Sequence, residues 1–322
     1  MGVVTVPEKF AQRVSERYSL TPPVDVRAML HRYAEVIDAR IPILGVDGVC
    51  LNLKTPGKKT RVVINASNPL LRRRFTEAHE LGHIIIPWHK GTIVDHLDPS
   101  HHVAGDDYWT FEDEANQFAA ELLMPSAWVK DAISAERDLA ELHRSISSEC
   151  QVSALAASRR LTTFLPRNVA FICEKGGEVE FSGKTDLTLA NVPAWGSAIN
   201  RNLYEHAKRH YSASLGDRRL HWWVFPEEIA ASATDERPWR EILNVIVEQI
   251  GIPADDRTRF KMSVNGVLAA ANSAVKRQGR HTKESVVAAC LQRFNDREDL
   301  RDFAHHPLFL DFVVKRSDEL TR

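Results

Sequence analysis

The chain has 322 residues, of which 43% are hydrophobic and 26% are charged, the proportions of an ordinary globular protein. This composition excludes a disordered or fibrous chain, and the length allows two domains or one large one. The formal net charge of -1 gives no whole-protein attraction to nucleic acid or to an anionic membrane.

The cysteines and the apolar segments indicate the cellular compartment in which the protein is found. Cys50, Cys150, Cys173 and Cys290 lie far apart and form no C-x-x-C pair, so neither a zinc knuckle nor a disulfide framework is indicated. No apolar N-terminal run has the pattern of a signal peptide, and no stretch approaches the roughly 20 apolar residues that span a bilayer. We therefore expect a cytoplasmic protein with no membrane partner.

Hydrophobic periodicity and turn residues divide the first half of the chain into short helices and strands. In chain order we predict helices over residues 8–18 and 24–36, strands over 46–53 and 61–65, a helix around residue 79, a polar loop over 90–108, a helix over 111–123 and another from residue 126. The segment from about 138 to 164 has the pattern of a helix-turn-helix, with Gln151-Val152-Ser153 as its turn.

The character of the chain changes near Asn168. In chain order we predict a hairpin of strands over residues 169–173 and 179–182, a strand over 222–225, and helices over 242–250, 264–276, 283–294 and 308–314. The best domain boundary therefore lies near Pro166, with a weaker one near Arg237. We expect an α+β fold with a first domain over 1–125, a helix-turn-helix-like region over 126–166 and a mixed, mostly helical C-terminal domain over 167–322.

The sequence His79-Glu80-Leu81-Gly82-His83 points most directly to chemistry, because it is an H-E-x-x-H motif. Two histidines four positions apart share one face of a helix, so both imidazoles can bind one Zn²⁺ ion while Glu80 activates a water at the metal's open position. Apolar residues flank the motif at helical spacing, as around a buried active-site helix. That context favours a metal site over an accidental pair of core histidines.

A zinc site needs a third protein ligand, and His89 is the first candidate. It lies six positions after His83, the separation used when a third histidine completes such a site. That arrangement requires a sharp turn, usually at a glycine, and this chain has Ile86 and Pro87 there. We therefore interpret His89 as a pocket or surface histidine and as the weaker candidate ligand.

The helix over residues 111–123 supplies the second candidate. Glu112 and Asn116 lie one turn apart, so Glu112 can bind the metal while Asn116 holds the far ring nitrogen of a zinc histidine. Glu114 points about 160° away from Glu112 on an ideal helix, so both cannot be ligands. Glu114 is kept as the alternative ligand. If no metal binds, these carboxylates would only stabilise the first turn of the helix through its dipole.

Two segments together resemble a known family. Arg73 to His83 reads R-R-F-T-E-A-H-E-L-G-H, and Glu112 to Pro125 reads E-D-E-A-N-Q-F-A-A-E-L-L-M-P. These motifs resemble the ImmA/IrrE family of bacterial metallopeptidases, over roughly residues 20–165. The resemblance implies a zincin-like peptidase core.

The resemblance also assigns roles and a substrate class. It implies His79, His83 and Glu112 as zinc ligands and Glu80 as the general base. Members of the family cut or regulate repressor proteins in mobile-element induction and radiation-response signalling. The domain order resembles the IrrE branch, whose C-terminal module is a GAF-like sensor fold, although residues 168–322 show no clear match to that fold.

From these observations we predict a zinc endopeptidase that cleaves a partner regulatory protein, most simply a transcriptional repressor. Its mechanism would use Glu80 to take a proton from the metal-bound water. The alternative is a non-proteolytic regulator that uses the zinc core as a scaffold and the helix-turn-helix to bind DNA or a protein. A third interpretation joins the two in a toxin–antitoxin or phage-defence system. An intact Glu80 argues against a pure scaffold, which needs only the ligands.

Several side chains are weaker candidates for contact with a substrate or a transition state. His89 and Tyr108 are the two that we retain. The loop histidines His96, His101 and His102 have a similar claim, but exposed loop histidines rarely have such a role.

DNA binding has weak support. Arg159 and Arg160 lie on the second helix of the helix-turn-helix, but a single helix without another basic patch gives low affinity, because phosphate contacts supply most of the binding energy. Packing against the peptidase core is an equally good explanation of this helix.

Overall fold

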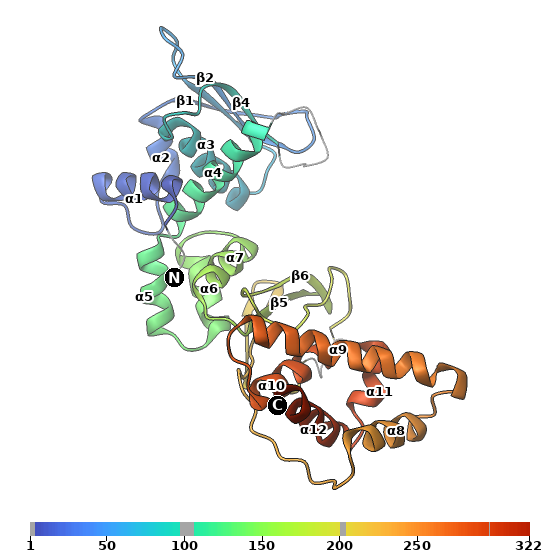
Figure 1. Ribbon diagram of the computed structural model, residues 1–322. Helices are drawn as coiled ribbons and strands as arrows, with labels where there is room; N and C mark the ends of the chain where they lie inside the picture. The colour runs from blue at the N-terminus through green and yellow to red at the C-terminus, as the bar shows by residue number, and fades with distance from the viewer. Residues whose placement is uncertain (1–3, 97–105, 200–203, 296) are drawn as a thin grey trace. The chain divides into compact units, whose positions relative to one another are not determined.

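The structure is a computed structural model that describes residues 4–96, 106–199, 204–295 and 297–322 (Figure 1). The chain divides into two compact units, Met1–Phe164 and Leu165–Arg322, and this division lies close to Pro166. Each unit combines helices with a four-stranded sheet, so the expected α+β class is confirmed. None of the helices in these described ranges is long and apolar enough to cross a membrane.

The sheet of the N-terminal unit supports the helix that carries the H-E-x-x-H motif. In chain order its strands are β1 (Glu35–Ala39), β2 (Val46–Leu53), β3 (Arg61–Asn65) and β4 (Gly91–His96). They lie side by side in the order β1-β3-β2-β4, with β1 parallel to β3 and β2 antiparallel to both of its neighbours. The observed bounds of β2 and β3 are those predicted from the sequence.

The motif helix is enclosed between this sheet and a second helix. α3 (Leu70–Ile85) contacts β2, β3 and α2 (Val26–His31), and it also contacts α4 (Asp106–Leu123), which in turn contacts α1 (Val6–Tyr18). Every residue from 76 to 83 is buried. A helix that is buried all round lies within a core rather than on a surface, so the motif sits inside the unit.

The sequence prediction was wrong at two places in this unit. The helix predicted over residues 24–36 ends at His31, and the chain continues as β1 from Glu35. Val26, Met29 and Leu30 are buried at helical spacing, whereas the next apolar residues pair with β3, a contact distant in sequence. The loop predicted over residues 90–108 contains β4, a short β-branched run among polar residues that pairs with β2.

Three helices complete the N-terminal unit, α5 (Ser126–Ala135), α6 (Leu139–Glu149) and α7 (Ala154–Phe164). α6 and α7 occupy the region predicted as a helix-turn-helix. Asp138 caps α6, accepting hydrogen bonds from two backbone amides of its first turn. The buried side chain of His143 on α6 donates from Nε2 to the carbonyl oxygen of Ala154, over 2.7 Å, and so ties the two helices together.

We expect His143 to make this unit sensitive to acid. Burial lowers its pKa from 6.5 to about 4, so the folded state holds the neutral ring. The neutral ring's contribution to stability is complete above pH 6.5 and falls as the unfolded chain takes up a proton, by about 1.4 kcal/mol per pH unit down to pH 4. Urea unfolding at pH 7, 6 and 5 should show a smaller loss in His143→Gln, which keeps an N–H donor. Equal losses in both proteins would contradict this assignment.

A buried ionic network joins the ends of four helices in the N-terminal unit. Arg160 of α7 bonds with Glu121 of α4 and Glu8 of α1, and it donates to Ser126 of α5 over 3.0 Å. Its Nε also donates to the carbonyl oxygen of Met124 over 3.0 Å. The Arg160 side chain is only 6% exposed, so it serves packing and is not available to DNA.

The C-terminal unit begins with an antiparallel sheet. Its strands are β5 (Val169–Lys175), β6 (Glu178–Lys184), β7 (Arg209–Leu215) and β8 (Arg218–Val224), in the order β6-β5-β8-β7. The prediction missed β7, whose sequence is polar and whose burial is slight, as is common for a strand at the edge of a sheet.

Helices form the rest of this unit. In chain order they are α8 (Trp239–Gln249), α9 (Arg257–Arg277), α10 (Lys283–Phe294), α11 (Arg301–Ala304) and α12 (Phe309–Thr321), with short 3-10 turns at Ala254–Asp256 and at Glu298–Leu300, the latter labelled η2. Their apolar side chains pack together in one buried core. A second buried cluster, which includes Ile172 and Trp223, lies on one face of the sheet. Hydrogen bonds link the two parts, including Gln292 to the carbonyl of Pro226 over 3.3 Å.

Candidate metal centre

Two helices bring three potential metal ligands together inside the N-terminal unit. The Nε2 atoms of His79 and His83 on α3 lie 3.0 Å apart, and they lie 3.2 and 3.4 Å from the two carboxylate oxygens of Glu112 on α4. One ligand atom from each residue falls within a group no wider than 4.8 Å. All three residues are buried, with exposures of 1%, 0% and 5%. Two imidazoles and a carboxylate form the donor set of known catalytic zinc sites.

The protonation states at this centre suit a metal. Burial lowers the pKa of His83 to about 4, so its ring is neutral near pH 7. Burial opposes ionisation of Glu112, but hydrogen bonds with His79 and His83 outweigh it and lower its pKa to about 2. Metal binding requires neutral imidazole and ionised carboxylate, and the pKa shifts of His83 and Glu112 favour these forms.

Asn116 orients the first histidine. Its side-chain oxygen lies 3.0 Å from Nδ1 of His79, one helical turn beyond Glu112 on α4. An amide oxygen only accepts, so Nδ1 carries the proton and Nε2 keeps its lone pair directed at the centre.

A chain of side chains orients the second histidine. Nδ1 of His83 lies 2.8 Å from Nδ1 of His89, and Nε2 of His89 lies 2.9 Å from a carboxylate oxygen of Glu114. If His83 binds a metal through Nε2, its Nδ1 donates to His89, and His89 in turn donates to Glu114. Glu114 also accepts from the indole N–H of Trp88 over 2.6 Å. Glu112 therefore faces the centre and Glu114 faces the histidine behind it.

Lys54, to which the sequence analysis assigned no role, binds the turn after α3. Its ammonium group donates to the carbonyl oxygens of His83, Ile86 and His89, over 3.0, 2.7 and 2.8 Å. These contacts supply donors to carbonyl oxygens in the last turn of α3 and in the turn that follows it. They also hold His89 in contact with His83, although the turn lacks the glycine that such a sharp turn usually contains.

Two glycines allow the close packing of the motif helix. A Cβ atom on Gly48 of β2 would lie 2.2 Å from Oε1 of Glu80 and 2.7 Å from Cγ2 of Thr76, so the Glu80 carboxylate rests directly against the strand backbone. A Cβ atom on Gly82 would lie 3.1 Å from the ring of Phe118 on α4. Glu80 itself is fully buried. The sequence analysis assigned no role to Gly48, and nothing in its local pattern marks it.

Residues 45–162 match the family model of the IrrE N-terminal-like domain, of peptidase family M78. This segment belongs to the ImmA/IrrE family. The ImmA/IrrE match includes both helices of the candidate metal centre and ends within α7, and it confirms the resemblance seen in the two sequence motifs. A comparison with curated proteins gave no match to the chain.

The ImmA/IrrE domain is a metallopeptidase domain, and the His79, His83 and Glu112 donor set fits a bound metal ion. The two residues retained as substrate contacts are both engaged within the unit. His89 is fully buried with both ring nitrogens bonded, and the hydroxyl of Tyr108 on α4 donates to the carbonyl of Val94 on β4.

The side chains of the three loop histidines considered as weaker candidates fall outside what the structure describes. His96 ends β4, and its side chain lies outside the part that the structure describes, as do His101 and His102 entirely.

Proposed function

We propose that the N-terminal unit is a cytoplasmic zinc endopeptidase that cleaves a partner regulatory protein, most simply a transcriptional repressor. The observation that carries the proposal is the buried convergence of His79, His83 and Glu112 within an ImmA/IrrE domain. The substrate class rests on what the family resemblance implies. The four cysteines are free and buried, which suits a reducing compartment.

In the proposed mechanism the polar groups at and around the metal centre divide the tasks among them. Zinc held by the two Nε2 atoms and the Glu112 carboxylate would polarise the scissile carbonyl and make water more acidic. A carboxylate oxygen of Glu80 accepts the proton of the attacking water and passes it to the leaving amine. Asn116 and His89 hold the two ligand rings in the required tautomers, and Lys54 holds His89.

A non-proteolytic regulator that binds DNA through α6 and α7 has less support. Arg160, one of two arginines on the second helix of that pair, is buried in an ionic network, and only Arg159 is exposed. A single exposed arginine supplies little phosphate binding.

The test is cleavage of the repressor encoded beside this chain, if there is one, by the purified full-length protein. We expect a new fragment with zinc-loaded protein, no fragment after the metal is removed with a chelator, and recovery when zinc is added back. Cleavage at an equal rate by metal-free protein would overturn the mechanism. If the zinc-loaded protein cuts no repressor but cuts another regulator recovered with it, the proposed repressor substrate is wrong. The proposed zinc endopeptidase mechanism is then retained.

His89→Ala should weaken zinc binding. Loss of the acceptor for Nδ1–H of His83 frees that ring to rotate and to change tautomer, and removal of such an outer partner typically costs about 10–100-fold in metal affinity. Competition with a chromophoric chelator would measure the dissociation constant. His31→Ala, at an exposed position on α2, is the control. Equal zinc affinity in His89→Ala and in the control would remove His89 from the proposed set.

A further inference from the structure

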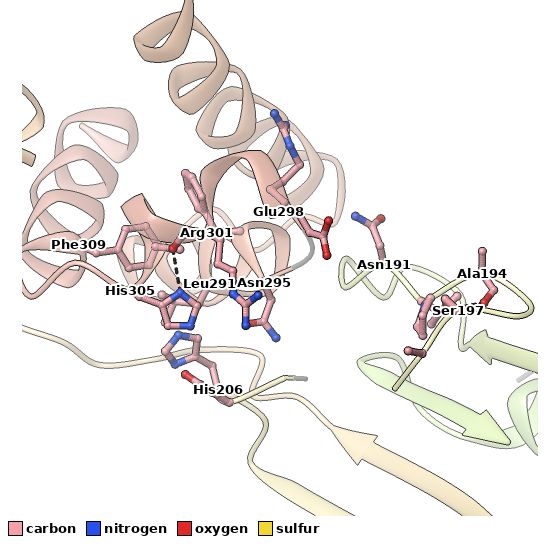
Figure 2. Close-up of a pocket in the computed structure, with 17 residues that line it drawn as sticks. Asn191, Ala194, Ser197, His206, Leu291, Asn295, Glu298, Arg301, His305 and Phe309 are labelled. Carbon is pink, nitrogen blue, oxygen red and sulfur yellow. Dashed lines mark hydrogen bonds between the residues drawn. The ribbon is translucent and has the colours of Figure 1, made fainter. Parts of the chain in front are cut away.

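The C-terminal unit contains a cavity that the peptidase chemistry does not use. Its volume is about 580 Å³, within the range of roughly 300–1,000 Å³ typical of small-molecule sites. Residues 191–194, 197–198 and 205–206, which lie between β6 and β7, line it on one side, and residues of α10, η2, α11 and the start of α12 line it on the other (Figure 2). It therefore lies between the strand-rich and helical parts of a single unit.

One wall of the cavity is apolar and fixed. Leu291, Phe294 and Phe309 line it, and their exposures are only 3%, 2% and 4%. The rings of Phe294 and Phe309 meet edge to face with centroids 5.1 Å apart, which locks both in the helical core. Such a wall offers a preformed surface to the apolar part of a ligand.

The other wall carries two imidazole rings at one end, those of His206 and His305. His305 donates from Nδ1 to the backbone carbonyl of Arg301 over 2.8 Å, and Figure 2 shows the ring of His206 next to that of His305. Because that bond uses the Nδ1–H group, Nε2 of His305 donates to an anion only when the ring carries both protons. Two carboxylates also line the cavity: Glu205, which precedes His206 in the chain, and Glu298, which lies toward Asn191 (Figure 2).

The two arginines that line the cavity differ in their engagement. Arg297 is held by both carboxylate oxygens of Asp299, over 2.7 and 2.6 Å, and it also donates to Ser263 over 2.7 Å. No residue in the described ranges accepts a hydrogen bond or ion pair from the guanidinium of Arg301, which is exposed. Arg301 is therefore the charged donor that an incoming group can use.

We propose that this cavity binds a small organic anion, whose carboxylate or phosphate group contacts Arg301 with His206 and His305 and whose apolar part lies against Phe294 and Phe309. A planar guanidinium forms paired hydrogen bonds with either group, so Arg301 supplies the affinity for the charge. The aromatic wall selects for an apolar body. Binding would not depend on the metal centre, which lies in the other unit.

The probe is 1-anilinonaphthalene-8-sulfonate, an aromatic anion whose fluorescence rises in apolar sites, titrated into the full-length protein. We expect saturable binding that Arg301→Ala weakens at least about tenfold, the loss typical of a charge-assisted hydrogen bond. Arg277→Ala, at an exposed arginine on α9 outside the cavity, should bind as wild type does. Thermal melting confirms that each variant is folded, and Arg301→Gln replaces Arg301→Ala if that variant does not fold.

Two further experiments test where the probe binds and which charged group the cavity prefers. Leu291→Trp should fill the cavity and reduce binding of the probe, whereas the neutral analogue N-phenyl-1-naphthylamine should bind equally well to wild type and Arg301→Ala. Displacement by orthophosphate or by phenylacetate separates a phosphate from a carboxylate preference. Unchanged affinity in folded Arg301 variants, or displacement by neither competitor, would overturn the proposal.

Discussion

A Glu80→Gln variant is expected to bind zinc as tightly as the wild type and to cleave its partner about 100–10,000-fold more slowly. The amide keeps the size of the carboxylate and fits beside Gly48, so the packing of α3 on β2 is preserved. It can neither accept a proton from water nor pass that proton to the leaving amine, and these are the two steps assigned to Glu80. Metal content and the single-turnover rate of substrate cleavage, measured on the same preparation, check both parts.

Glu77→Gln is the matched control for this variant. Glu77 lies on the same helix, is also buried, and pairs with Arg27 over 2.9 Å rather than with the metal centre. We expect it to change stability but not the rate of the folded, zinc-loaded protein. Wild-type cleavage by zinc-loaded Glu80→Gln would exclude Glu80 as the base, and loss of zinc from that variant would make it a structural residue.

Much of the candidate centre follows from short-range helical geometry. A separation of four positions places the rings of the two motif histidines on one face of α3, and the same separation joins Glu112 to Asn116. The choice between Glu112 and Glu114 depends on which face of α4 contacts α3. The pairing of a ligand with an amide one turn away favours Glu112 from sequence, and the structure directs Glu112 at the histidines and Glu114 at His89.

The supporting residues could not be found in this way, because their contacts are distant in sequence. Lys54 is an isolated lysine at the end of a strand, yet it bonds to carbonyls near residue 86. Gly48 is one glycine in a strand, and only the approach of Glu80 explains it. The sequence analysis made His89 the weaker candidate ligand because the turn before it contains no glycine. In the structure the Lys54 ammonium group stabilises that turn through hydrogen bonds to its carbonyl oxygens.

The fold shows the same division between local and distant causes. Strong local patterns gave the bounds of β2, β3 and α10 correctly. The error over residues 24–36 arose because the apolar period of α2 runs by coincidence into β1, whose partner β3 decides its conformation. Pairing between strands cannot be read from the period of either strand alone.

Arg160→Ala is expected to lower the free energy of unfolding of the N-terminal unit by about 3–5 kcal/mol. Arg160 and Glu121 are both buried, with side-chain exposures of 6% and 2%. Removing the guanidinium leaves the carboxylate of Glu121 without its counter-charge, and it also removes the donor to Met124 at the end of α4. Urea unfolding followed by circular dichroism would measure the loss.

The neighbouring residue separates this effect from a general loss of charge on α7. Arg159 is exposed, so Arg159→Ala should change stability by no more than about 0.5 kcal/mol. The double variant Arg160→Met with Glu121→Gln should be more stable than Arg160→Ala, because it leaves no buried charge unpaired. Equal stability of Arg160→Ala and Arg159→Ala would mean that the buried ionic network contributes nothing to the stability of the N-terminal unit.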